Sequence, residues 1–182
     1  GARCGSVGRV STRSRTRAAF TNEDPGAATA AGSRTTVHVG NVEWLRDLDV
    51  RYQREFAGSR VLELGSLNIN GTARDYLRHR EWIGIDHTAG PDVDRVCHAI
   101  ETRFVAGGAF DVLLCTSMLE HDPAWRESLS WNLQWLRRGG LVLLSWGAEG
   151  NAHHPPEPWA PVPVADVEAW VAQQRLVTLE SY

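Results

Sequence analysis

The stretch RVLELGSLNINGTARDYLRHREWIGID, residues 60–86, decides the fold of this chain. It begins with an apolar run at residues 61–64, which suits a strand that is covered on both faces. Gly65 ends this run where the backbone must turn, and a second run at residues 82–86 ends in a carboxylate. The segment between them, residues 72–80, is expected to be a helix. The stretch therefore predicts a strand, a glycine-containing turn, a helix and a second strand.

The spacing within this stretch is typical of a nucleotide site. In an open parallel sheet, ligands bind outside the carboxyl ends of strands, and an acidic residue about 20 positions after the first turn can accept hydrogen bonds from a ribose diol. Gly65 and Asp86 have this spacing. A dinucleotide fingerprint beginning at Gly65 would also need glycine at the positions of Leu67 and Asn70. This difference argues against a nicotinamide-dependent oxidoreductase.

Strands and helices alternate along the rest of the chain. A helix is expected after Asn41, because apolar residues recur there at helical spacing, and another is expected after the N-cap Asp122. Such alternation implies right-handed crossovers, so the predicted fold class is α/β, a doubly wound, mostly parallel sheet with helices on both faces. The further strands are predicted at residues 93–97, 110–115, 141–146 and 176–181, and the further helices at residues 42–57, 123–138 and 164–174.

The composition fits one globular domain. A chain of 182 residues has room for a single layered core, and its 42% hydrophobic and 23% charged residues are typical of globular proteins. No apolar run approaches the roughly 18 residues of a membrane span, and the net charge of −3 gives no general attraction to nucleic acid or acidic membranes. The three cysteines have no metal-ligand spacing and suit a reducing compartment. We therefore expect a cytoplasmic protein without a membrane partner.

Residues 1–36 differ in composition from the rest of the chain. They are rich in Gly, Ala, Ser, Thr and Arg and contain few large apolar residues, so they cannot form a core. Their arginines would also suit a nucleic-acid arm or an organellar transit peptide. Because the chain begins with Gly and its single methionine is Met118, we expect a disordered or non-native leader. The folded domain is then residues 37–182.

Over roughly residues 40–147, the sequence resembles the class I S-adenosylmethionine-dependent methyltransferases. The resemblance rests on the order and spacing of several short motifs. They are ELG at residues 63–65, Asp86, CHA at residues 97–99, FDVLLCTSMLEHDP at residues 110–123 and LRRGGLVLLSWG at residues 136–147. The resemblance implies a Rossmann-like fold and S-adenosylmethionine as the cofactor. The family sheet normally ends with an antiparallel strand, so either that strand is missing here or the sheet is shorter.

The resemblance also implies which residues bind the amino-acid tail and ribose of the cofactor. Gly65 would let the backbone approach the tail, Glu63 would orient its ammonium group, and Asp86 would accept hydrogen bonds from the ribose. A structural carboxylate is the alternative for Asp86, since a charged group that ends an apolar strand needs a partner. The polar lining of the turn would add Ser66, Asn70 and Gly71.

The adenine pocket is expected beyond the second and third strands. His87 would stack on the adenine ring, or else it is a solvated loop histidine. Ala99 and Ile100 would wall the ring, and Thr116 would face the cofactor from the end of the fourth strand. His98 stands where the family often has an aspartate near the adenine amino group, which weakens the transfer of that role.

The acceptor is expected to be a small molecule bound above the fourth strand. Glu120 and His121 resemble an EH pair common in small-molecule members of the family, and His121 would act as the catalytic base. Alternatively, Glu120 satisfies backbone donors and His121 packs beneath the loop. The proline-rich loop at residues 151–164, which contains Trp159, would cover the acceptor. The same loop holds His153, His154 and Glu157, but its prolines keep it extended, so we expect no metal site.

Two further functions compete with methyl transfer. A non-catalytic S-adenosylmethionine-binding or scaffold protein would explain Leu67, His98 and the missing last strand. A nucleic-acid modifier that uses the arginine-rich leader is disfavoured by the net negative charge and by the absence of an NPPY-type sequence after the fourth strand.

Overall fold

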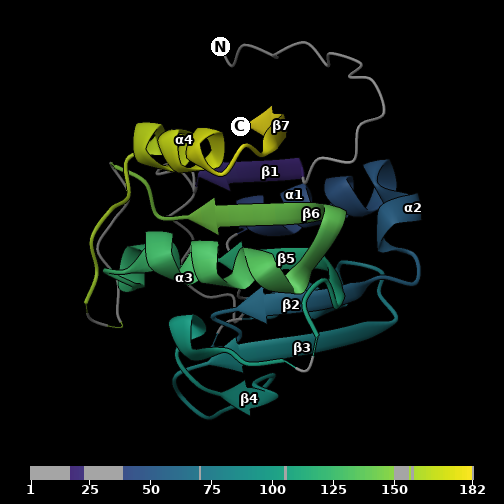
Figure 1. Ribbon diagram of the computed structural model, residues 1–182, viewed down its shortest axis with the longest axis horizontal. Coiled ribbons are helices and arrows are strands. Elements are labelled where there is room, and N and C mark those ends of the chain that lie inside the picture. The colour runs from purple at the N-terminus through teal and green to yellow at the C-terminus, as the bar shows by residue number, and fades with distance from the viewer. Residues whose placement is uncertain are drawn as a thin grey trace.

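The fold is built on one parallel sheet (Figure 1). The computed structural model describes residues 17–22, 39–69, 71–104, 106–149, 156 and 158–181. Within this part of the chain, seven strands follow the spatial order β4-β3-β2-β5-β6-β1-β7. Each pair is parallel, which confirms the predicted sheet type. The strands are β1 (Arg17–Asn22), β2 (Arg60–Leu64), β3 (Glu81–Asp86), β4 (Arg95–Val96), β5 (Phe110–Thr116), β6 (Leu136–Trp146) and β7 (Val177–Ser181).

Strand β2 is central to the half of the sheet that carries the predicted site. It pairs with β3 on one side and β5 on the other, and residues 61–64 are all buried. The strands predicted from the apolar runs on both sides are found in place. The edge strand β4 is shorter than the predicted 93–97. Before it, the carboxylate of Asp94 accepts the N–H of Gly84 (2.7 Å), so a side chain takes the place of a backbone acceptor in the strand pairing.

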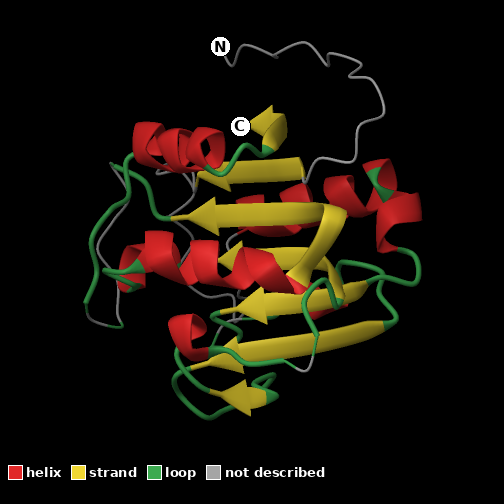
Figure 2. Ribbon diagram, in the orientation of Figure 1, coloured by secondary structure: helices red, strands yellow, loops and turns green. Residues whose placement is uncertain are grey.

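Helices cover both faces of the sheet, as predicted (Figure 2). Since neighbouring strand residues point to opposite faces, the sheet contributes to two separate cores. One core packs under α3 (Trp125–Asn132) and α4 (Val164–Gln173), and the other under α1 (Val39–Arg51) and α2 (Gln53–Phe56). No helix in the described part of the chain is long and apolar enough to cross a membrane.

The predicted helix at residues 72–80 is wrong. The structure has only the 3₁₀-helix η2 (Ala73–Asp75) there, which begins where the Thr72 side chain accepts the N–H of Arg74 (3.3 Å). The chain then leaves the helical path because Asp49 on α1 accepts the N–H of Arg78 (2.8 Å) and also pairs with its guanidinium (3.0 Å). A tertiary partner thus replaces the intrahelical hydrogen bond.

The helix after β5 is also shorter than the predicted 123–138. Asp122 accepts the N–H of Ala124 (2.8 Å) and the hydroxyl of Ser128 (2.6 Å), so the turn stays outside the helix and α3 begins two residues later than Pro123. At its far end, α3 passes through the 3₁₀-helix η5 (Leu133–Trp135) directly into β6. Strand β6 therefore starts five residues before the predicted 141–146, with a register shift opposite the start of β5.

Strand β1 corrects the expectation that all of residues 1–36 lie outside the fold. All six of its residues pair with β6 on one side, and residues 17–20 pair with β7 on the other. The composition argument counted apolar side chains, whereas a strand between two others is held by main-chain hydrogen bonds on both edges. Of the two alternatives for the end of the sheet, no antiparallel strand is present among the described residues, and β1 adds a strand between β6 and β7 that runs parallel to both. Residues 1–16 and 23–36 lie outside the described residues.

Removing β1 should destabilise the domain. Truncation of residues 1–36 removes every main-chain bond between β1 and its two neighbours, so the free energy of unfolding should fall by roughly 2 kcal/mol or more. Truncation of residues 1–16 keeps β1 and is the matched control. Urea unfolding of both proteins measures the difference, and equal midpoints and slopes would show that β1 contributes nothing to stability.

Candidate functional site

The carboxyl ends of four neighbouring strands meet at one edge of the sheet. Strands β3, β2, β5 and β6 are adjacent and parallel, and Figure 1 shows their arrowheads pointing the same way. The residues that end or follow these strands at this edge are Asp86, Gly65, Thr116 and Gly147. The fold therefore brings the predicted turn, ribose carboxylate and acceptor loop to one side of the molecule.

Gly65 allows the turn after β2 to lie against the loop after β5. Its φ of +74° is in the left-handed region, and a Cβ built on it would lie 2.8 Å from the Cβ of Met118. Its N–H donates to the carbonyl of Ile85 on β3 (2.9 Å). Any other residue would strain the backbone and clash with the base of a side chain, so this position requires glycine.

The other predicted residues of this turn have different surroundings. Ser66 is buried, and its hydroxyl lies against Gly84 without a hydrogen-bond partner in the described part of the chain. Gly71 is exposed, has a φ of +117°, and donates its N–H to the side-chain oxygen of Asn68 (2.7 Å). Asn70 lies outside the described residues. Ser66 thus points toward β3, while Gly71 closes the turn at the surface.

Asp86 ties the end of β3 to the turn after β2. One carboxylate oxygen accepts the N–H of Thr88 (2.8 Å), and the other lies 3.3 Å from the N–H of Leu67. Nδ1 of His87 is 3.3 Å from the first of these oxygens, and the Asp86 side chain is 10% exposed. Because a carboxylate has about four lone-pair positions, Asp86 can keep these contacts and still accept hydrogen bonds from a ligand.

The predicted adenine residues lie beyond β3 and β4. The imidazole rings of His87 and His98 are stacked, with centroids 5.5 Å apart and an interplanar angle of 10°. In the 3₁₀-helix η3 (Ala99–Glu101), the Ala99 carbonyl accepts the side-chain amide of Asn132 on α3 (2.7 Å), while Ile100 is 42% exposed. The two histidines and Ile100 are therefore accessible, whereas Ala99 is held toward the core.

Glu63 is a buried carboxyl group on the face of the sheet that α1 covers. It is 3% exposed, and its Oε2 accepts the indole N–H of Trp82 (2.8 Å). Burial raises the pKa of Glu63 to about 7, although this hydrogen bond and the charge of Arg74 act in the opposite direction. Glu63 therefore changes its charge near neutral pH, unlike an exposed glutamate.

The loop after β5 contacts part of the predicted cover. Thr116 is half-buried at the strand end, and the 3₁₀-helix η4 (Leu119–His121) follows it. The N–H of Ala160 donates to the carbonyl of Glu120 (2.7 Å), and Nδ1 of His121 lies 3.2 Å from the carbonyl of Pro158. A carbonyl only accepts, so the proton of a neutral His121 ring is on Nδ1 and the lone pair is on Nε2.

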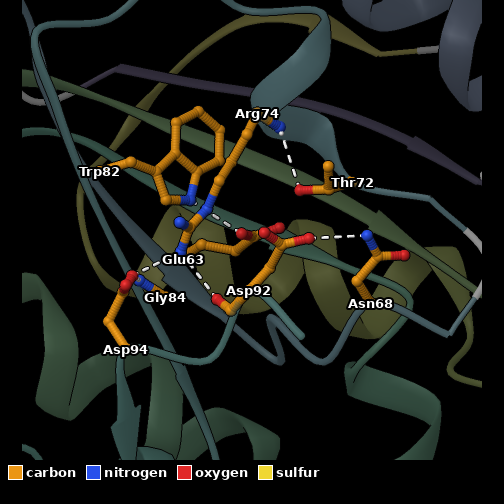
Figure 3. Close-up of polar contacts among 8 residues, drawn as sticks. All are labelled: Glu63, Asn68, Thr72, Arg74, Trp82, Gly84, Asp92 and Asp94. Atoms are coloured by element: carbon orange, nitrogen blue, oxygen red, sulfur yellow. Dashed lines mark hydrogen bonds and ion pairs between the residues drawn. The ribbon is translucent and has the colours of Figure 1, made fainter. Parts of the chain in front are cut away.

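A polar network beside Glu63 was missed by the sequence reasoning (Figure 3). We call residues 65–72 the β2 turn and residues 87–94 the β3 turn. The side-chain amide of Asn68 donates to the Asp92 carboxylate (2.6 Å), and Arg74 reaches the same β3 turn. The available signal was a pair of aspartates two residues apart, Asp92 and Asp94, at the start of the predicted third strand.

One other candidate region, a pocket, does not coincide with the predicted site. A pocket of about 350 Å³ lies at the opposite edge of the sheet, near the amino ends of β2, β5 and β6, where Arg137 pairs with Asp111 (2.5 Å). Among the residues that the structure describes, no three His, Cys, Asp or Glu side chains are grouped to hold a metal ion. His153, His154 and Glu157 lie outside those residues.

Comparison with solved structures identifies the class of fold. The chain is similar to the YcgJ protein from Bacillus subtilis, with a TM-score of 0.52, 17% identity and coverage of 72% of this chain and 68% of that one. It is also similar to 1,6-didemethyltoxoflavin-N1-methyltransferase from Burkholderia thailandensis, solved with 1,6-didemethyltoxoflavin and S-adenosylhomocysteine. That match has a TM-score of 0.50, 16% identity and coverage of 76% and 72%.

The chain therefore has the Rossmann-like fold of the S-adenosylmethionine-dependent methyltransferases. A search of protein-family models and a search of curated proteins found no match to the sequence. At identities this low, the structural similarity establishes the fold, and the function is argued from the site.

Glu63→Gln should change how stability depends on pH. The pKa of Glu63 is raised to about 7 in the folded protein. The stability that the protonated form gives to wild type is therefore fully present below the pKa of Glu63 in the unfolded chain, and it is lost as pH rises through 7. Glutamine keeps the acceptor for Trp82 and does not titrate. The variant should therefore gain stability relative to wild type as pH rises from about 4.5 to above 7, by up to roughly 3 kcal/mol.

Urea unfolding at a series of pH values measures this difference. Glu81→Gln is a suitable control, because Glu81 is an exposed carboxylate that pairs with Arg60 (2.7 Å) and its pKa is lowered. A constant difference between Glu63→Gln and wild type across the range would contradict the raised pKa.

Proposed function

We propose that this protein is an S-adenosylmethionine-dependent methyltransferase with a small-molecule acceptor. One observation carries the proposal: in a methyltransferase fold, Gly65, Asp86 and the loop after β5 share the edge where such folds bind ligands. The similar Burkholderia thailandensis enzyme holds both a small-molecule substrate and S-adenosylhomocysteine, which supports the same two ligand classes here. In this proposal the protein acts in the cytoplasm.

The predicted residues divide the cofactor site into three parts. The β2 turn, with Gly65 at its start, receives the amino-acid tail, and Glu63 lies beneath it. Asp86 accepts the ribose hydroxyls, since its side chain is partly accessible and already faces the turn. The adenine lies beside the stacked histidines. The complete set of cofactor residues proposed is Glu63, Gly65, Ser66, Asn70, Gly71, Asp86, His87, Ala99, Ile100 and Thr116.

Bound S-adenosylmethionine supplies a methyl group on a positively charged sulfur, which a nucleophile can attack directly. The residues of this chain would hold the acceptor in line with that methyl group, and well-held reacting pairs reach effective molarities of about 10⁵ M or more. His121 would accept the proton of a hydroxyl acceptor at Nε2, while its Nδ1–H continues to donate to the Pro158 carbonyl. This contact fixes the ring and links the cover to the base.

The charges of the two loops that are proposed to surround the acceptor favour a neutral or cationic acceptor over an anionic one. The loops after β5 and β6, residues 117–123 and 147–163, contain no arginine or lysine, and they carry four acidic residues. An anion bound between them would lack the charged donors that usually hold carboxylates and phosphates. In a screen of matched small molecules, methylation should fall when an acceptor gains an anionic group.

Calorimetric titration with S-adenosylhomocysteine tests the cofactor site, and release of that product from S-adenosylmethionine in an acceptor screen tests turnover. Binding together with turnover supports the enzyme. Binding without turnover on any acceptor would favour the non-catalytic alternative. Leu67, one of the residues that suggested this alternative, packs its side chain against Gly90. Absence of binding would refute both.

Asp86→Asn should weaken S-adenosylmethionine binding more than it destabilises the fold. Asparagine keeps one oxygen for the turn but loses the charge, and a charge-assisted hydrogen bond is worth roughly 1.5 to 3 kcal/mol, or about ten- to a hundredfold in affinity. Titration of the purified variant measures the effect, with Asp75→Asn on η2 as the control. Unchanged affinity with lower stability would make Asp86 a structural carboxylate.

His121→Gln should lower the rate with a hydroxyl acceptor by about 10² or more, because glutamine can still donate to the Pro158 carbonyl but cannot accept the proton. Affinity for S-adenosylmethionine should stay the same, since His121 lies on the acceptor side. Single-turnover rates measure the change. An unchanged rate would remove His121 from the chemistry and leave positioning as the main catalytic effect.

A further inference from the structure

The β2 turn is held by side-chain contacts instead of by a long helix. The segment that follows it forms only η2, whose three residues provide little anchorage. The N–H of Asn68 donates to the carbonyl of Pro91 (3.1 Å), and its side chain donates to Asp92 (2.6 Å). Leu67 packs so closely on Gly90 that a Cβ there would lie 2.3 Å from its Cδ1. The position of the β2 turn thus depends on the β3 turn.

Arg74 joins these two turns to the sheet. Its Nη2 donates to the carbonyl of Asp92 (2.7 Å) and to the carboxylate of Asp94 (2.5 Å), which in turn accepts the Gly84 N–H of β3 (2.7 Å). Figure 3 shows the side chain running past the Trp82 ring, whose centroid is 5.9 Å from the guanidinium carbon. The Arg74 side chain is only 20% exposed. One guanidinium therefore links η2, the β3 turn and strand β3.

Trp82 lies between this guanidinium and the buried carboxyl of Glu63: its indole N–H donates to Glu63 (2.8 Å), and its ring centroid is 5.9 Å from the guanidinium carbon. Four groups act on that carboxyl: the Trp82 indole from β3, Arg74 from η2, and Asp92 and Asp94 from the β3 turn. The positive charge of Arg74 lowers the pKa of Glu63, and the two aspartates raise it. Without Arg74, the remaining charges would all repel an ionised Glu63, and the carboxyl would keep its proton to higher pH.

We propose that Arg74 is a positioning residue of the cofactor site, which fixes the β2 turn against the β3 turn and supplies the positive charge opposite Glu63. The inference rests on the proposed function, because it concerns the turn that would receive the amino-acid tail of S-adenosylmethionine. An arginine with a purely structural role would affect stability, but it would not move the pH midpoint of ligand binding. This difference makes the two roles separable.

Calorimetric titration with S-adenosylhomocysteine from about pH 5 to about pH 9 tests the inference. Arg74→Met should weaken binding about tenfold or more. It should also raise the pH midpoint, which is the pH at which affinity is halfway between its low-pH and high-pH values, because Glu63 keeps its proton to higher pH without the arginine. Arg74→Lys keeps the charge and should restore the midpoint, although it recovers only part of the affinity because one ammonium does not reproduce the planar guanidinium. The matched control is Arg78→Met, which breaks the Arg78–Asp49 pair (3.0 Å) elsewhere in the same crossover.

Two further variants complete the test. Glu63→Gln with Arg74 intact should abolish the midpoint, and a midpoint that persists would assign the titration to another group and overturn the inference. If Arg74→Met does not fold, Arg74→Gln, which also removes the charge, takes its place in the comparison with Arg78→Met.

The outcomes separate this inference from the proposed function. Binding by wild type with equal affinity in Arg74→Met and Arg78→Met, or weaker binding with an unmoved midpoint in Arg74→Met, would overturn the role of Arg74 alone. Failure of wild type to bind S-adenosylhomocysteine would overturn the proposed function, and the positioning role with it. Weaker binding with a raised midpoint only in Arg74→Met supports the inference.

Discussion

Parallel pairing of β2 with both β3 and β5 is the constraint on which the candidate site depends. It places three consecutive strand ends at one edge, although the chain connects them through crossovers of very different lengths. The turn after β2 then contacts β3 through the N–H of Gly65 and the loop after β5 through the Met118 side chain. Gly65 contacts both β3 and the loop after β5. The same contacts therefore determine the edge of the sheet and the shape of the site.

Local sequence patterns were sufficient for the elements that bury apolar side chains. The runs at residues 61–64, 82–86 and 110–115 are strands because their side chains enter the two cores, and the spacing from Gly65 to Asp86 follows from one strand pair and its connection. The amphipathic helices were found for the same reason. In this half of the molecule, burial, strand pairing and turn chemistry agree.

The features that were missed depend on partners distant in the sequence. The expected helix at residues 72–80 is replaced because the N–H of Arg78 donates to the carboxylate of Asp49, which is 29 positions away. Asn68 and Asp92 are 24 positions apart, and Arg74 and Asp94 are 20 apart. Strand β1 pairs through its backbone, which composition does not report. Neither apolar periodicity nor local propensity contains such information, so these parts could not be predicted from single segments.

The placement of Glu63 connects the stability of the fold to the proposed site. A carboxyl that is 3% exposed and has a pKa of about 7 makes the folded state less stable at neutral pH than an amide of the same shape would. Apolar packing alone would not require an acid there, since its neighbours on the same face of the sheet, Val61 on β2 and Leu114 on β5, are apolar and buried. Groups whose charge is shifted by burial and specific partners are concentrated at functional sites. The buried acid, its arginine and the two aspartates lie next to the turn where the cofactor tail is proposed to bind. The residue that destabilises the fold at neutral pH is therefore located where the proposed function would use a charge.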